Sequence, residues 1–480
     1  MGLGFHCEHQ EQTLISSQRK PNPLFFPTPT PPLHRKNDDN NGSGGDFSWG
    51  NETKYILLHP YGAQIQCIMH CVGALMAYPY DSWILIIPLM QQLLANYKRL
   101  LRLTESKFHR YMFDKVNWNG RLVGILGARG VGKTTMILQH IKETMDVNRC
   151  LYVNAEDFYF ASHKLVDLAD EFCKMGGEYL CVDEVHRYEG WSKELKLIYD
   201  YHPDLKVLFS GSSVLDINKG VQADLSRRAV TYTMYGLSFR EYLELFEGIE
   251  SRTYSLDEVL AHKVEMPTKF RPLMYFRRYL QKGYYPFALE DDYERKLVGI
   301  VTKTLETDIP EYANMNVSTG RKLKRLMAVI AESVPFKPNM LTLAEVLGIS
   351  RNNVADYLLY IEEAGLITQL RDRTAGVRSL GKVDKVYLEN TNLIYALAKA
   401  DNAEMGNVRE TFFMNQLRVV DDPVTSPVSD FMVGDRTFEV GGRSKKQKQI
   451  RGVENAFVVK DDIEYGALNV IPLWMFGMMY

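Results

Sequence analysis

The chain has 480 residues, 45% of them hydrophobic, and a formal net charge of −2 at neutral pH. This length predicts about three domains, and this hydrophobic content is normal for a folded protein. A net charge so close to zero argues against a protein that coats nucleic acid with its whole surface, although it leaves room for a local basic patch. The six cysteines are scattered, which indicates buried thiols and a cytoplasmic protein rather than a disulfide framework.

Residues 1–89 differ in composition from the rest of the chain. A proline-rich stretch from Pro21 to Pro32 and a polar stretch from Asn37 to Gly45 are typical of disorder. Two apolar runs follow, but prolines interrupt them and each is shorter than the ~20 residues that span a bilayer. We therefore expect a disordered segment, or an extension from an upstream start codon, and no membrane association.

A glycine-rich loop lies between a predicted strand at 122–126 and a predicted helix at 135–143. It fits the pattern G-x-x-x-x-G-K-[ST], in which backbone N–H groups and a helix N-terminus face an anion. We expect Lys133 to reach the β- and γ-phosphates of ATP and Thr134 to ligate Mg²⁺. The alternative is a glycine loop that fits the pattern by chance, but such a loop would not be expected to have a strand before it and a helix after it. The residues expected to bind nucleotide are Gly127, Ala128, Arg129, Gly130, Val131, Gly132, Lys133, Thr134 and Thr135.

An acidic pair ends the next informative strand, at 178–184. Asp183 is placed to hold the Mg²⁺ shell through water, and Glu184 to polarise the attacking water. The strand predicted at 150–154 lies between the two motifs, so we expect a parallel sheet with both motifs at strand ends. A solvated acidic pair at a strand end is the alternative.

Two further polar positions are candidates for sensing or stabilising a γ-phosphate. Ser212 follows the strand predicted at 206–210, where it is either a sensor of the γ-phosphate or an ordinary helix cap. Arg228 could stabilise charge on a transferring phosphoryl group, from its own subunit or from a neighbour in a homo-oligomer. A surface arginine is the alternative.

Several motifs occur in the order found in a group of prokaryotic AAA+ ATPases, which the chain resembles from about residue 90 to residue 480. They lie at 127–135, 182–186, 209–213 and 235–243. The resemblance implies a P-loop ATPase, a winged helix and a C-terminal domain related to restriction endonucleases. Arg228 matches the arginine of the family's Gly-Arg pair, although Arg227 stands where glycine is usual.

The implied fold class is α/β, with an AAA+-like parallel sheet. The expected regions are an ATPase domain at 90–262, a helical lid at 263–330, a winged helix-turn-helix at 331–400 and a small nuclease-like domain at 401–480. The residues after 244 are charged and helical in pattern, and we expect them to pack beside the nucleotide as the lid.

The winged helix is predicted from two short helices and a strand. Ser350 can cap a helix that runs from Arg351 to Ala364, and residues 382–388 would form part of a wing. In a DNA reader the start of the second helix contacts bases, and Arg351 and Asn352 have suitable chemistry. Winged helices also serve as protein-contact modules, so a protein partner is the alternative.

The last eighty residues hold an incomplete nuclease pattern. Glu410, Asp430 and Glu439 stand where related nucleases bind Mg²⁺, but Gly441 occupies the position of the lysine that aids water activation. Arg443 or Lys445 could substitute only from a shifted position. Separately, a basic run could hold nucleic-acid phosphates or be a solvated loop; its residues are Arg443, Lys445, Lys446 and Lys448.

The leading hypothesis is a Mg²⁺-dependent ATPase that uses nucleotide state to reposition its winged-helix and nuclease-like domains. The first alternative is a nucleotide-gated DNA-binding regulator, in which ATP acts mainly as a switch. An ATP-dependent nuclease is the second, and Gly441 argues against it.

Overall fold

A computed structural model describes residues 81–212, 221–333, 335, 337–372, 382–397 and 404–480. Its first helix, α1, runs from Asp81 to Leu103 and so begins inside the segment expected to be disordered. The prediction for residues 1–80 lies outside the described residues. None of the described helices is both long enough and apolar enough to cross a bilayer.

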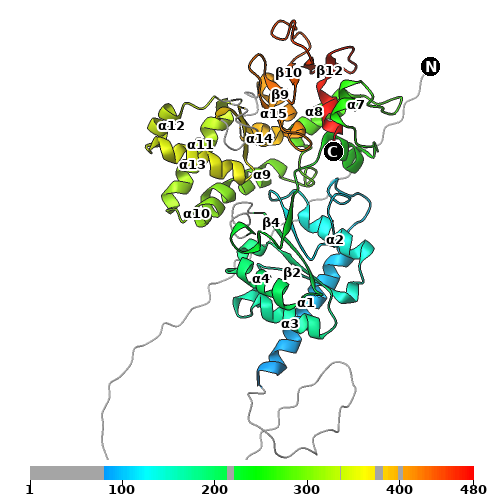
Figure 1. Cartoon of the computed structure of the whole chain (residues 1–480), viewed down its shortest axis with the longest axis vertical. Coiled ribbons are helices and arrows are strands. Elements are labelled where there is room, and N and C mark those ends of the chain that lie inside the picture. The colour runs from blue at the N-terminus through cyan, green and yellow to red at the C-terminus, as the bar shows by residue number, and fades with distance from the viewer. Residues whose placement is uncertain (1–80, 213–220, 334, 336, 373–381, 398–403) are drawn as a thin grey trace, which may run out of the picture. The chain divides into compact units, whose positions relative to one another are not determined.

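A five-stranded parallel sheet forms the first half of the described chain (Figure 1). Parallel strands need crossover connections, and here these contain α2 (Lys133–Thr144), α3 (Leu165–Lys174) and α4 (Trp191–Tyr201). The predicted α/β class is confirmed. The strands, in the spatial order β2-β3-β4-β1-β5, are β1 (Leu122–Leu126), β2 (Cys150–Asn154), β3 (Tyr179–Asp183), β4 (Lys206–Gly211) and β5 (Val230–Thr233).

Both faces of β1, β2, β3 and β4 are buried, which explains why these strands read as largely apolar runs, whereas β5 at one edge of the sheet is mostly exposed. Leu126 packs on one side in a cluster with Leu168 of α3 and Leu195 of α4. Ile125 points to the other side, in a cluster with Ile137 of α2. The sheet is therefore covered by helices, and its polar chemistry is confined to the strand ends. Because the strands are parallel, the ends of β1, β3 and β4 share one edge, which brings the glycine-rich loop, the acidic pair and Ser212 together.

A helical region follows the sheet. Residues 304–308 form one π-helical turn that continues α9 (Tyr293–Lys303) into α10 (Ile309–Tyr312). The longer helices of this region are amphipathic, so each buries one face against its neighbours. The elements are α6 (Phe239–Glu247), α7 (Leu256–Leu260), α8 (Pro272–Lys282), α9 (Tyr293–Lys303), α10 (Ile309–Tyr312) and α11 (Val317–Ser333).

Two helices and an antiparallel strand pair occupy the predicted winged-helix region. Helices α12 (Met340–Leu347) and α13 (Arg351–Glu363) are joined by a tight turn, in which Ser350 Oγ accepts the amide of Asn353 at 3.2 Å. Strands β6 (Ile367–Arg371) and β7 (Val383–Leu388) pair next to them. The tip between these strands, at 373–381, lies outside the described residues, and the winged-helix assignment stays a prediction.

The C-terminal region is a small α/β unit. Helix α15 (Met405–Leu417) packs on a second five-stranded sheet, of order β12-β11-β10-β9-β8, through Phe413, which contacts the rings of Phe438 and Phe476. The final 3-10 turn, Leu473–Met478, is buried. The other elements are α14 (Thr391–Leu397), α15 (Met405–Leu417), β8 (Val424–Thr425), β9 (Phe431–Val433), β10 (Arg436–Gly441), β11 (Ala456–Lys460) and β12 (Val470–Pro472).

The segment after β5 contacts both the glycine-rich loop and the C-terminal unit. Ser238 Oγ and Arg240 Nε both donate to the main-chain oxygen of Tyr480, at 2.6 and 2.9 Å. On the other side of the same segment, Arg110 donates to Glu241 and to the main-chain oxygen of Val131 in the glycine-rich loop. The segment at 235–243, recognised in the sequence only as a motif, is therefore a junction between the loop and the C-terminal unit.

Candidate nucleotide site

The glycine-rich loop has the backbone shape that its glycines predict. Gly127, Gly130 and Gly132 have φ angles of 151°, 81° and 99°, in the region that favours glycine. A side chain at Gly127 would overlap the main-chain oxygen of Met234, and one at Gly130 would overlap the ring of Phe287. Only glycine therefore lets the loop lie this close to both neighbours.

Lys133 is buried inside the loop that it follows. Its ammonium donates to the main-chain oxygens of Gly127 at 2.8 Å and Ala128 at 3.1 Å. Burial lowers the pKa of Lys133, whereas the neighbouring Glu184 and Asp183 act in the opposite direction. Both acceptors are loop carbonyls, so phosphate oxygens could replace them without moving the lysine far.

Asp183 is the centre of a dense hydrogen-bond set at the end of β3. Its Oδ2 accepts the hydroxyl of Thr134 at 2.5 Å and the phenol of Tyr152 at 2.6 Å. Its Oδ1 accepts the hydroxyl of Ser210 and the amide of Glu184. Neither Tyr152 nor Ser210 was identified from the sequence.

The donor set at Asp183 and Thr134 fits Mg²⁺. Both side chains supply oxygen, the atom that Mg²⁺ prefers, and they already lie within hydrogen-bond distance. The described residues contain no group of three metal-ligating acids, histidines or cysteines. Mg²⁺ in phosphate sites commonly uses only one or two carboxylates plus the phosphates themselves, so these two side chains are compatible with such a site, and Mg²⁺ binding stays a prediction.

Glu184 lies beside Asp183 in a left-handed backbone conformation, with φ of 50°. Its Oε2 accepts the hydroxyl of Ser212 at 2.8 Å, and Nδ1 of His186 lies 3.5 Å from the same oxygen. The structure therefore brings together two of the three residues predicted to be catalytic, Glu184 at the end of β3 and Ser212 at the end of β4.

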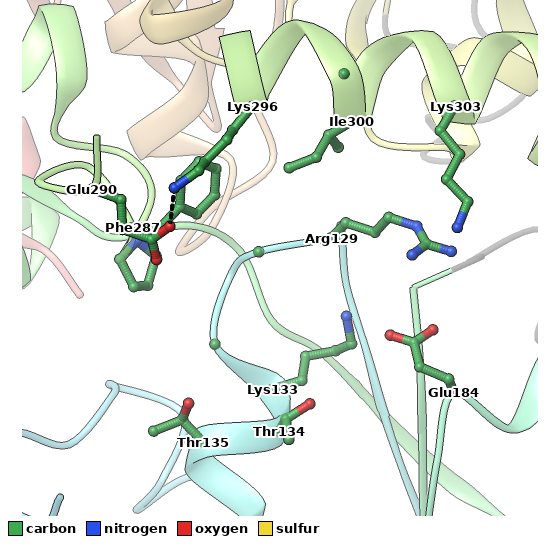
Figure 2. A pocket seen from close by; sticks show the side chains of 14 residues that line it. Arg129, Lys133, Thr134, Thr135, Glu184, Phe287, Glu290, Lys296, Ile300 and Lys303 are labelled. Atoms are coloured by element: carbon green, nitrogen blue, oxygen red, sulfur yellow. Dashed lines mark hydrogen bonds and ion pairs between the residues drawn. The ribbon is translucent and has the colours of Figure 1, made fainter. Parts of the chain in front are cut away.

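A cavity of about 740 Å³ opens above these residues (Figure 2). Figure 2 shows Ile300 and Lys303 reaching from α9 toward Arg129, with Lys133 and Glu184 below. The first half of the chain contributes Arg129, Gly130, Gly132, Lys133, Thr134, Thr135 and Glu184 to the wall. The helical region contributes Pro286, Phe287, Glu290, Lys296, Gly299, Ile300 and Lys303, none of which was identified from the sequence.

A second cavity, of about 680 Å³, adjoins the first. The two share Gly132, Thr135 and Pro286. Its wall comes from the end of α1, the segment after it, α2 and α6, and its apolar side chains include Leu103, Phe108, Met136, Leu138 and Leu245. A ligand with a polar and an aromatic end could therefore occupy both.

Arg228 lies elsewhere. It forms an ion pair with Asp200 of α4, at 2.9 Å between Nε and Oδ1, and is not among the described residues that line either cavity. The structure therefore does not bring Arg228 together with Lys133 and Glu184 within one chain. A role from a neighbouring subunit stays a prediction.

The predicted nuclease residues form two groups. Lys385 Nζ lies between Glu410 and Asp430, at 3.0 and 3.4 Å. Glu439 is buried and pairs with Lys445 at 3.2 Å. The stem of Lys445 occupies the space beside Gly441 that a side chain there would need. Lys445 thus reaches Glu439 from a shifted position, while metal binding by these acids stays a prediction.

The predicted nucleic-acid contacts are exposed. Arg351 and Asn352 begin α13. Arg443, Lys446 and Lys448 lie in the exposed segment after β10, whereas Lys445 is partly covered by its contact with Glu439. The exposure of these side chains is compatible with nucleic-acid binding, which stays a prediction.

Comparisons with known proteins agree with this arrangement. Residues 119–243 match the model of a family described as an AAA domain, and residues 274–404 match a domain of unknown function. An uncharacterised protein of Methanocaldococcus jannaschii, MJ1637, is 24% identical over 300 residues, which are 58% of this chain and 63% of that protein. The match thus spans less than two thirds of the relative's length.

Two solved structures are similar over part of the chain. One is the Walker-type ATPase PABY2304 of Pyrococcus abyssi, at 14% identity and a TM-score of 0.38, covering 60% of this chain and 95% of that one. The other is DnaA of Aquifex aeolicus bound to AMPPCP, at 15% identity and a TM-score of 0.21, covering 52% and 85%.

Proposed function

Because residues 119–243 are an AAA-type domain, we propose that the chain is a Mg²⁺-dependent ATPase whose nucleotide state repositions its helical and C-terminal regions. One observation carries the proposal. Four residues lie together at one edge of the sheet: Lys133, Thr134, Asp183 and Glu184. Three of them, Lys133, Thr134 and Glu184, line the cavity beneath α9.

Each residue of this edge has a distinct role in the proposed reaction. Lys133 and the loop N–H groups bind the β- and γ-phosphates of ATP. Mg²⁺ held by Thr134 and Asp183 would neutralise developing charge on those phosphates. Glu184 orients and polarises the attacking water, and Ser212 orients Glu184.

The second cavity supports the choice of a nucleotide over a simple phosphate. Phe108 and Met136 offer apolar contact for a base, and the shared wall at Gly132 and Thr135 would carry the ribose toward the phosphates. The adjoining cavities therefore match the two ends of ATP.

The proposed movement rests on where the cavity lies. Its upper wall is Ile300 and Lys303 of α9, and its lower wall is the phosphate loop. A ligand with a γ-phosphate and one without it would contact this wall differently, and only such a difference can shift a conformational equilibrium.

Binding and scattering measurements test the proposal. A fluorescent ATP analogue should bind the wild type. In Lys133→Ala, its affinity should be lower by about tenfold or more. Small-angle X-ray scattering should differ between the ADP complex and the complex with a non-hydrolysable ATP analogue. Identical curves at saturating nucleotide would remove the repositioning from the proposal, and absence of binding would remove the ATPase.

A DNA-binding regulator is the second candidate, favoured by the exposure of Arg351 and of the basic segment at 443–448. Gel shifts with ADP and with an ATP analogue, repeated across salt concentrations, would detect it. Charge reversal at Lys446 and Lys448 should weaken binding. If wild type shifts no DNA at low salt, this candidate fails.

Nuclease activity is tested by incubating plasmid with Mg²⁺ and ATP, with Glu439→Ala as the control.

A further inference from the structure

Asp308 connects both nucleotide-binding motifs to the helical region. Its Oδ2 lies 3.5 Å from Nε of Arg129 in the phosphate loop. Its Oδ1 accepts a hydrogen bond at 2.8 Å from Nη2 of Arg187, in the turn that follows Glu184. Asp308 itself ends the π-helical turn that continues α9. One carboxylate therefore holds three segments that are far apart in the sequence.

The Arg129 side of this contact is incomplete. Neither Nε nor Nη2 of Arg129 donates a hydrogen bond, although both atoms are buried. Buried donors without an acceptor are costly, and an anion is the acceptor that a guanidinium favours. Because Arg129 also lines the cavity above Lys133 (Figure 2), a γ-phosphate bound there could satisfy these donors.

Two arginines also lie near His186. Burial, followed by the neighbouring Arg187 and Arg129, lowers the pKa of His186 to about 3, so the ring is neutral at physiological pH. Its two ring nitrogens also lack hydrogen-bond partners. His186 therefore adds no positive charge beside Arg129, and the unsatisfied donors of Arg129 are the observation that points to an anion.

We propose that Asp308 is a positioning residue that competes with the γ-phosphate of ATP for Arg129. The inference rests on the proposed ATPase function. In the ADP state, Arg129 stays paired with Asp308. This ion pair, called the clasp below, connects the phosphate loop to the helical region. In the ATP state, Arg129 turns to the γ-phosphate and the clasp opens. Arg187 continues to neutralise Asp308, so the change leaves no buried carboxylate unpaired.

This arrangement gives the helical region a way to read nucleotide state. Residues 274–404 match a domain of unknown function, and Asp308 lies inside that match. The residue that distinguishes ATP from ADP would then be shared between the phosphate loop and this domain.

Equilibrium binding of a fluorescent non-hydrolysable ATP analogue and of fluorescent ADP tests the clasp. In Asp308→Asn, Arg129 is free before ATP arrives, so affinity for the ATP analogue should rise about tenfold. Affinity for ADP should stay within about twofold of wild type. Glu311→Gln is the matched control, because Glu311 contacts Arg187 at 3.3 Å but has no part in the competition for Arg129; its ratio of affinities should equal that of wild type.

A double variant makes the test specific. Arg129→Gln should weaken binding of the ATP analogue more than binding of ADP, and Asp308→Asn should add nothing to that difference in the Arg129→Gln background. Thermal melting checks that each variant folds, and if Asp308→Asn does not fold, the Arg129→Gln measurement decides alone. The clasp is wrong if Asp308→Asn leaves the ratio of affinities unchanged, or if its effect persists without Arg129. Wild type that binds neither nucleotide would instead overturn the proposed function.

Discussion

Ser212 donates its hydroxyl to Oε2 of Glu184 at 2.8 Å, and the Ser212 amide lies 3.3 Å from the same oxygen. The end of β4 therefore orients the carboxylate at the end of β3. Glu184 also has a φ of 50°, a conformation that is costly for a residue with a side chain. The position of this carboxylate is thus held by a contact as well as by a strained backbone.

Removing that contact should slow hydrolysis without weakening ATP binding. In Ser212→Ala, Glu184 loses its orienting partner, and we expect kcat for phosphate release to fall about tenfold. Ser212→Thr keeps the hydroxyl and should retain most of the activity. If the threonine variant is as slow as the alanine variant, or if only KM changes, the orienting role is wrong.

A methyl group at Gly127 should weaken nucleotide binding. The φ of 151° and the overlap with Met234 would force the phosphate loop to move, and we expect affinity for an ATP analogue to fall at least tenfold, roughly. Gly176 is the control, because it also has a positive φ but no atom near its missing side chain. Gly176→Ala should cost only about 1 kcal/mol of stability, and binding should be unchanged. Equal binding losses in both variants would contradict this explanation.

The buried pair of Arg110 and Glu241 should be a major source of stability. Glu241 is fully buried, accepts Arg110 Nε at 3.0 Å, and also accepts the amide of Tyr111. Glu241→Gln leaves a buried arginine without its countercharge, so the free energy of unfolding should fall by about 3–5 kcal/mol. Chemical denaturation measures the change.

Glu244 supplies the matched control for that experiment. It pairs with Arg240 at 2.9 Å, but its side chain is 27% exposed. Water screens such a pair, so Glu244→Gln should cost no more than about 1 kcal/mol. Similar losses for the two glutamates would show that burial of Glu241 is not the cause.

Acid should destabilise the AAA-type domain through His140. The ring is stacked on Trp118 at 3.9 Å, and burial lowers the pKa of His140 to about 4. Because this value lies below that of the unfolded chain, about 6.5, the contribution of neutral His140 is complete above pH 6.5 and is lost as the pH falls toward 4. His140→Phe keeps the stacking and removes the proton, so its stability should decline less between pH 6.5 and pH 5. Parallel declines, measured by denaturation at each pH, would exclude His140 as the cause.

The sequence predicts those parts of the site that are local in the chain. The strand before the loop, its glycines and the helix after it lie within about twenty residues, and their chemistry follows from the backbone that phosphate binding requires. The same holds for Asp183 and Glu184 at the end of an apolar strand. The contact of Ser212 with Glu184 was predicted only as a general sensing role, because the partner comes from another strand.

The residues that close the site could not be predicted in this way. Ile300 and Lys303 lie on an amphipathic helix whose pattern is the same as that of any helix with one buried face. Asp308 and Arg187 are ordinary charged residues in the sequence, and only the fold brings them to Arg129. For the same reason, the pairing of Arg228 with Asp200 could not be seen from a motif.

Phosphate release from ATP tests the central claim most directly, with purified wild type, Lys133→Ala and Glu184→Gln compared in the presence of Mg²⁺. We predict turnover by the wild type, loss of both binding and turnover in Lys133→Ala, and in Glu184→Gln a rate lower by about a hundredfold or more with ATP affinity retained. A wild-type rate no higher than that of Lys133→Ala would contradict the account.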